Sequence, residues 1–130
     1  MHSVNSKKEI KGSMDEVIEK VTKALQKQGF GILTRIDLHI KVKEKLGKEI
    51  QPTAILGACH PELALQAYQT DTDVTALMPC NVVARQTSSG KVSVEFSSAA
   101  ALLSLLKHNK LEKFGQDVDK RLAQALAEIS

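Results

Sequence analysis

The sequence contains few of the residues on which several classes of protein depend. Its 130 residues include no tryptophan, one tyrosine, three phenylalanines, three prolines and two cysteines. So few aromatic side chains offer little for stacking with the bases of a nucleic acid. Two cysteines are too few for a disulfide framework, so we expect reduced thiols and a cytoplasmic protein.

Charge and long apolar runs are also limited. The 18 Lys and Arg residues exceed the 15 Asp and Glu residues by a net charge of +3, which is too small to indicate a nucleic acid or a membrane as partner. The most apolar stretch, residues 99–106, is far shorter than the roughly 20 residues that cross a membrane. No apolar run follows the charged start, so we expect no secretory signal.

What is present fits one α+β domain over residues 1–130, with 42% apolar and 25% charged residues. Apolar residues at helical spacing predict a helix over 14–28, with Ser13 and Glu16 as a capping box. Alternating residues predict a strand over 30–38. The whole pattern predicts the order β-α-β-α-β-α-β-β-α-α.

The other elements follow from the same periodicities and from turn residues. We expect a first strand over 4–10, a short helix over 38–46, a buried strand over 53–59 and a helix over 61–70. Residues 74–78 and 81–86 are expected to form two strand pieces hinged at Pro79, or one bulged strand. A hairpin turn at 87–90 leads to a strand over 92–96, and two helices follow over 99–106 and 111–129, separated at Asn109.

Two short motifs place sulfur and imidazole groups where strands end. Cys59, His60 and Pro61 lie at a strand-to-helix junction, and Cys80 follows Pro79 at the entry to the hairpin. A helix N-terminus lowers the pKa of a nearby thiol, and the resulting thiolate attacks electrophiles or binds a soft metal such as zinc. Alternatively, each cysteine serves as a small buried apolar side chain.

The spacing of these residues does not define a metal site by itself. Cys59 and Cys80 are 21 positions apart, and no C-x-x-C or H-x-x-H pair accompanies them. Cys59, His60 and Cys80 are nevertheless the candidate metal ligands, with a fourth ligand needed from a second subunit. The hypothesis requires the two corners of the chain to meet in space, with Asn81 on the same wall.

Asp37 and His39 form a second candidate pair, because a carboxylate beside an imidazole can orient a general base. The simpler interpretation is that Asp37 caps the helix over 38–46 and that His39 lies on the exposed side of that helix. The sequence has none of the phosphate-binding, dinucleotide-binding, nucleophile-elbow or zinc-protease motifs.

Four segments together resemble the domain-of-unknown-function family 302. They are residues 29–38, 45–47, 55–64 and 78–83. The resemblance implies a TATA-box-binding-protein-like α+β fold, with a curved, mainly antiparallel sheet and helices packed on it, often as a homodimer. It implies no activity. Five residues of this chain match positions of the family's motifs: Asp37, Cys59, Pro61, Cys80 and Asn81. His60 differs, because it stands where the family motif G-A-C-N-P has asparagine.

Three functions remain open at this point. The first is a homodimeric module that binds a small-molecule ligand or a soft metal in a cleft near the cysteines. Its candidate ligand-binding residues are Asp37, Cys59, His60, Pro61, Cys80 and Asn81. The second is a structural or interaction domain with buried cysteines. The third is a thiol-dependent redox enzyme, with Cys59 as nucleophile and Cys80 as resolving thiol. We favour a binding module over an enzyme.

Overall fold

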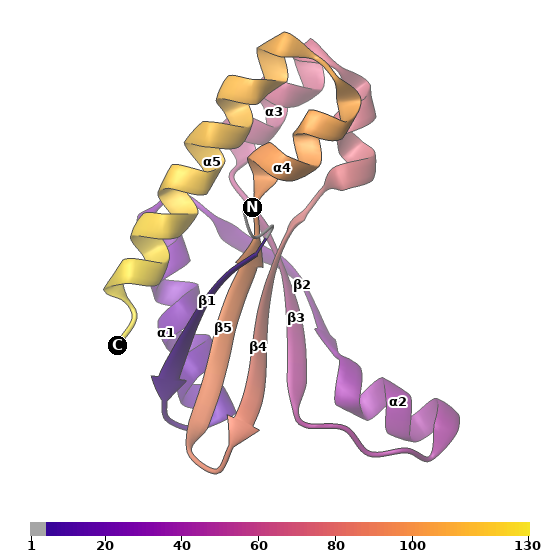
Figure 1. The fold of residues 1–130 in the computed structure, drawn as a ribbon, viewed down its shortest axis with the longest axis vertical. Coiled ribbons are helices and arrows are strands. Elements are labelled where there is room, and N and C mark those ends of the chain that lie inside the picture. Colours follow the sequence, from indigo (N-terminus) through magenta and orange to yellow (C-terminus); the bar gives the residue numbers. More distant parts are fainter. Residues whose placement is uncertain (1–4) are drawn as a thin grey trace.

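A five-stranded antiparallel sheet forms the centre of the fold (Figure 1). The computed structural model describes residues 5–130, so Val4 of the first expected strand lies outside the described residues. In spatial order the strands are β1 (Asn5–Lys11), β5 (Lys91–Ser97), β4 (Cys80–Ser88), β3 (Thr53–Cys59) and β2 (Gly31–Asp37). Each neighbouring pair is antiparallel. The predicted α+β class and order of elements are confirmed.

Two helices cover one face of this sheet. Helix α1 (Met14–Lys27) begins at the expected cap, where the Ser13 hydroxyl oxygen accepts the Glu16 N–H at 3.2 Å. Helix α5 (Asn109–Glu128) packs beside α1. Side chains such as Val21 and Leu122 from these helices share one buried core with alternate residues of the strands. The apolar faces of the two helices therefore pack against the apolar face of the sheet, and this contact buries both from water.

A second group of helices extends past one end of the sheet. It consists of α3 (Pro61–Thr70), the 3-10 helix η1 (Thr72–Leu77), α4 (Ala99–Leu103) and the 3-10 helix η2 (Ser104–Leu106). Their apolar side chains pack around Ala67, Val74 and Leu111 of α3, η1 and α5 to form a smaller second core. Figure 1 shows these helices beside the upper half of α5.

The strand piece expected over residues 74–78 is wrong, because η1 occupies this segment. The Asp71 carboxylate accepts the Asp73 N–H at 2.9 Å and so begins a helical turn. Val74 then turns inward and is fully buried in the second core. A strand here has no neighbour to pair with among the described residues, whereas the 3-10 turn satisfies its own backbone.

Helix α2 (Leu38–Leu46) differs from the others because it extends away from the sheet and from the remaining helices (Figure 1). It ends at Gly47, whose φ of 65° lies in the left-handed region that glycine adopts without strain. None of its residues is buried. Across the part of the chain that the structure describes, no helix is both long and apolar enough to cross a membrane.

Candidate functional site

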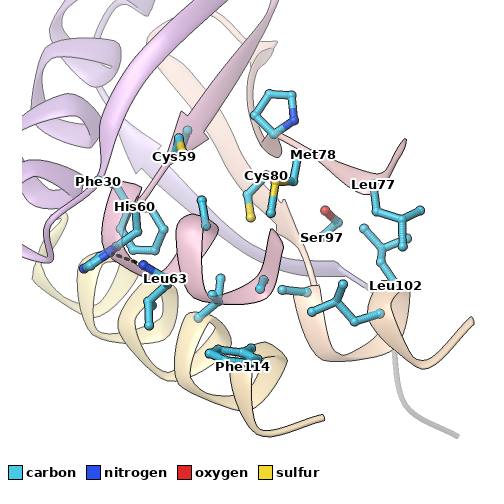
Figure 2. Close-up of a pocket in the computed structure, with 17 residues that line it drawn as sticks. Phe30, Cys59, His60, Leu63, Leu77, Met78, Cys80, Ser97, Leu102 and Phe114 are labelled. Carbon is cyan, nitrogen blue, oxygen red and sulfur yellow. Dashed lines mark hydrogen bonds between the residues drawn. The ribbon is translucent and has the colours of Figure 1, made fainter. Parts of the chain in front are cut away.

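The two cysteine-bearing corners meet in space, as the sequence hypothesis required. Strand β3 ends at Cys59, strand β4 begins at Cys80, and the register places Ala58 directly opposite Cys80. Cys59, His60 and Cys80 all line one pocket, which we call the Cys80 pocket (Figure 2). The antiparallel pairing of β3 with β4 brings these residues together, although they are far apart in the chain.

The Cys80 pocket lies where the sheet ends and the second group of helices begins. Its volume is about 60 Å³. None of its lining residues is Asp, Glu, Lys or Arg within the described chain. The lining residues are Phe30, Ala58, Cys59, His60, Leu63, Ala64, Ala67, Leu77, Met78, Pro79, Cys80, Ser97, Ala99, Leu102, Leu103, Phe114 and Val118.

The two thiols occupy different surroundings within this site. Cys80 lies opposite Ala58, which is part of the main core, so its side chain is on the helix-covered face of the sheet. Cys59 follows Ala58 directly, and strand alternation directs its side chain toward the other face. Both cysteines are free. Both thiols nevertheless line the Cys80 pocket.

The environment raises the pKa of both thiols. Burial raises the pKa of Cys59. Burial, followed by the nearby Cys59 thiol and the Asp119 carboxyl group, raises the pKa of Cys80 to about 11. Burial thus shifts the pKa of Cys59 in the direction opposite to the one predicted from its place before a helix N-terminus, so that prediction is wrong. At neutral pH both groups are uncharged thiols.

His60 sets the direction of α3 rather than pointing at the cysteines. Its Nδ1 accepts the Leu63 N–H at 3.3 Å, which caps the helix that begins at Pro61. Its ring stands edge-on to Phe30, with centroids 5.5 Å apart and planes at 82°. On its other side lies Gly29, where an added Cβ atom would come within 2.6 Å of the His60 Nε2. Figure 2 shows the imidazole directed away from both thiols.

The predicted metal ligands consequently do not form a ligand cluster. Nowhere in residues 5–130 do three or more His, Cys, Asp or Glu side chains gather in a way that could hold a metal ion. Cys59 and Cys80 share the Cys80 pocket with the thioether of Met78, while the Nδ1 of His60 is engaged in the cap.

Asp37 lies at the far end of the sheet from the Cys80 pocket. It pairs with Ala54 at one end of β3, whereas Cys59 at the other end pairs with Gly31. Asp37 occupies the N-cap position of α2 as expected, but its side chain makes no capping bond. Instead its carboxylate accepts a hydrogen bond from Arg35 at 3.1 Å.

His39 is not on the exposed side of α2, so that prediction is wrong. Its Nδ1 accepts the Thr53 N–H at 3.0 Å and thereby attaches α2 to β3. No bond joins Asp37 to His39 among the interactions of the described residues, so they do not form an oriented acid–base pair. Asn81 is exposed and lines a separate hollow with Val83 and Glu95.

Helices α4 and α5 also contribute to the site, which the sequence did not indicate. Asp119 of α5 accepts hydrogen bonds from the Ser98 hydroxyl and from the Ala99 N–H, each at 2.6 Å. These bonds hold the start of α4 against α5 beside the pocket. Asp119 lies 21 residues from Ser98 along the chain, and no local sequence pattern indicates such a contact.

The helices also approach closely at Gly115 of α5. A Cβ atom at this glycine would come within 2.5 Å of the Ala100 Cα. The absent side chain therefore lets α4 lie directly on α5, with Phe114 next to it lining the pocket.

The fold and the pocket thus define an α+β domain with a small apolar site at one end of an antiparallel sheet. The family model described as "Domain of unknown function DUF302" matches residues 6–129, and the chain belongs to this family. The crystal structure of an uncharacterized conserved DUF302 protein from Bacillus stearothermophilus is similar, with a TM-score of 0.92 and 25% sequence identity over 99% of this chain and 100% of that chain. A comparison with curated proteins gives no match.

Proposed function

We propose that the domain binds a small, uncharged, mainly apolar ligand in the Cys80 pocket. The observation that carries this proposal is the composition of the lining: aliphatic, aromatic and sulfur-containing side chains with no carboxylate, ammonium or guanidinium group. A charged ligand placed there would lose its hydration without gaining a counter-ion, at a cost of several kcal/mol. The neutral state of the Cys80 thiol keeps the site uncharged.

The volume limits the ligand to a few non-hydrogen atoms. An apolar protein cavity of about 150 Å³ accommodates benzene or xenon. The Cys80 pocket, at about 60 Å³, is less than half that size. Ser97 and the Cys80 thiol are the polar groups that would orient a bound molecule, since the Nδ1 of His60 is engaged in its cap.

Xenon, with dichloromethane as a second probe, tests the proposal by heteronuclear NMR. We expect both probes to shift the methyl signals of Leu63, Leu102 and Leu103, which line the pocket, and acetate to leave these signals unchanged. The variant Ala64→Leu places three further carbon atoms in the pocket and should abolish the shifts.

The matched control is Ala123→Leu, the same substitution at an exposed position of α5, which should bind both probes normally. Methyl shifts of equal size with acetate, or shifts that persist in Ala64→Leu, would contradict the proposal. A folded spectrum of each variant without probe is the reference for this comparison.

A soft metal ion is the second candidate ligand, favoured by the two thiols and the Met78 thioether in the same pocket. Thiolate and thioether groups select Cu(I) over harder cations. Because both thiols have a raised pKa, binding would release protons and strengthen as the pH rises. Competition for Cu(I) with a chromophoric chelator should show tighter binding by the wild-type chain than by Cys80→Ala. Equal binding by the two chains would exclude Cys80 as a ligand.

Free thiols are a condition for the binding of a soft metal ion. Both cysteines are free, which is the state that the reducing cytosol maintains. A thiol-dependent enzyme is less well supported, because the raised pKa of each cysteine leaves little thiolate for nucleophilic attack.

A further inference from the structure

One residue in the wall of the Cys80 pocket changes its charge near neutral pH. Among the described residues that line this pocket, the ionisable side chains are those of Cys59, His60 and Cys80. Burial raises the pKa of both thiols, so they stay uncharged from neutral pH into acid. An imidazole is the side chain that gains a proton between about pH 8 and pH 5. The charge of the pocket wall in this range therefore depends on His60.

The hydrogen bond that His60 makes requires its uncharged form. Its Nδ1 accepts the Leu63 N–H at 3.3 Å, so the proton of the neutral ring is on Nε2. A second proton can bind only at Nδ1, where it would turn the acceptor into a donor that faces another donor. The charged ring would also lie at the positive end of the α3 dipole, which opposes a cation. Protonation of His60 therefore breaks the cap of α3.

The helical turn that this cap stabilises forms part of the pocket wall. Helix α3 has ten residues, and Leu63 and Ala64 of its first turn line the Cys80 pocket. The His60 ring also contacts Phe30, another lining residue, with ring centroids 5.5 Å apart. Figure 2 shows the imidazole beside Phe30 and bonded to the backbone of Leu63. Loss of the cap thus acts directly on residues of the pocket.

No neighbouring acidic group in the described chain offsets the charge of a protonated His60. On the side of the α1–β2 loop the ring meets Gly29 and Phe30, which do not titrate. Glu62 of α3 is exposed, and no described carboxylate forms an ion pair with His60. Asp119 of α5 is bonded to the start of α4. A proton on His60 therefore disfavours the capped, folded form of the turn.

Two other histidines accept a backbone N–H in the same way but lie outside the pocket lining. The Nδ1 of His39 accepts the Thr53 N–H at 3.0 Å and attaches α2 to β3. The Nδ1 of His108 accepts the Lys110 N–H at 3.2 Å at the start of α5. Neither imidazole lines the Cys80 pocket. These two residues are controls that carry the same chemistry without touching the site.

We infer that His60 is a pH-sensitive cap that regulates the Cys80 pocket: the neutral ring holds the first turn of α3 in place, and protonation releases this turn and weakens ligand binding. The effect on the ligand rests on the proposed function, whereas the release of the turn concerns the chain alone. A ligand that needs the ordered turn binds in proportion to the fraction of chains in which the turn is formed. Acid thus lowers the affinity of the pocket, with His60 as a positioning residue.

Xenon titrations at pH 7.5 and pH 5.0, followed by the methyl signals of Leu102 and Leu103, test this inference. Xenon carries no proton, so a change in its affinity reports a change in the protein. We expect the affinity of the wild-type chain to fall about fivefold at pH 5.0, a factor typical of the loss of one helix cap. In His60→Asn the ratio of the two affinities should be close to one, because asparagine caps a helix without titrating. His108→Asn is the matched control and should keep the wild-type ratio.

Two measurements without ligand examine the cap itself. Long-range proton–nitrogen NMR spectra of the His60 ring should show the proton on Nε2 at pH 7.5. Hydrogen-exchange protection factors, which correct for the intrinsic effect of pH on exchange, should fall about fivefold at Leu63 and Ala64 between pH 7.5 and pH 5.0. The amide of Ala125, which is buried in α5, should keep its protection and so show that the chain stays folded.

Three results would overturn the inference: equal xenon affinity of the wild-type chain at the two pH values, an equal loss of affinity in His60→Asn, or a ring proton on Nδ1 of His60 at pH 7.5. A wild-type chain that does not bind xenon at pH 7.5 would contradict the proposed function instead. In that case the amides of Leu63 and Ala64 decide alone: a loss of protection in acid supports the pH-sensitive cap, and unchanged protection overturns it.

Discussion

The buried thiol of Cys80 should make the domain lose stability at alkaline pH. In the folded chain the pKa of Cys80 is raised from the ordinary 9.0 to about 11, mainly by burial. At a pH between these two pKa values, the unfolded chain has released the thiol proton of Cys80, whereas the folded chain retains it. The folded state then binds more protons, so the free energy of unfolding falls as the pH rises from 9 toward 11.

The magnitude follows from the size of the pKa difference. Each pKa unit corresponds to about 1.4 kcal/mol, so a rise to about 11 corresponds to about 3 kcal/mol once the pH exceeds both values. At pH 10, halfway between the two values, about half of this, roughly 1.4 kcal/mol, should already be lost. Below pH 8 the contribution of Cys80 to the pH dependence should vanish.

Urea unfolding of the wild-type chain and of Cys80→Ala at pH 7.5, 9 and 10 measures this effect. Cys80→Ala removes a buried side chain and has its own constant cost, so the informative quantity is how the difference between the two chains changes with pH. Lysine and tyrosine titration affects both chains equally and cancels. We expect the wild-type chain to lose about 1.4 kcal/mol more than Cys80→Ala between pH 7.5 and pH 10.

Cys59→Ala is the matched control, because Cys59 is less buried and lies on the other face of the sheet. It should leave most of the alkaline loss in place. Parallel pH profiles for the wild-type chain and Cys80→Ala would refute the reasoning, since they would show that the Cys80 thiol ionises as easily in the folded as in the unfolded chain. Iodoacetamide labelling of the folded chain provides an independent check, with slow modification of Cys80 at pH 8.

Two further substitutions test the architecture around the pocket. Asp119→Ala leaves the Ser98 hydroxyl and the Ala99 N–H without their partner, and should lower the free energy of unfolding by about 2–3 kcal/mol in urea titrations; a change below 0.5 kcal/mol would show that water replaces the carboxylate. Gly29→Ala adds a side chain at a φ of 87°, where it clashes with His60, whereas Gly47→Ala adds one at a φ of 65° in open space. Gly29→Ala should therefore lower the thermal unfolding temperature clearly more than Gly47→Ala. Equal unfolding temperatures of the two variants would contradict this.

Local structure was predictable wherever a short stretch of sequence carries its own physical reason. The Ser13 cap, the apolar stripe of α1 and the proline that begins α3 act within a few residues of each other. The hairpin from β4 to β5 was predictable for the same reason, because its turn ends at Gly90 with a φ of 73°. The segment that contains Val74 was not predictable in this way, since its apolar residues fit a strand as well as a 3-10 turn and only packing against α3 and α5 decides between them.

The candidate site was predictable in part. Cys59 and Cys80 were expected at strand ends that meet, and they do. The roles of the histidines were not predictable, because the bonds of His39 to Thr53 and of His60 to Leu63 depend on side-chain directions rather than on spacing.

Most of the elements, their order and the two strand ends that carry the cysteines follow from the sequence, because periodicity, caps and turns are properties of neighbouring residues; the 3-10 helix η1 is the exception. Contacts in the folded chain set which face of the sheet each thiol occupies, how strongly burial raises the pKa of Cys80, and how α4 and α5 close the pocket through Asp119 and Gly115. These features arise from contacts between residues distant in the chain, and desolvation depends on everything that surrounds a group. The same is true of the apolar side chains of α2, which stay exposed because the chain folds away from them.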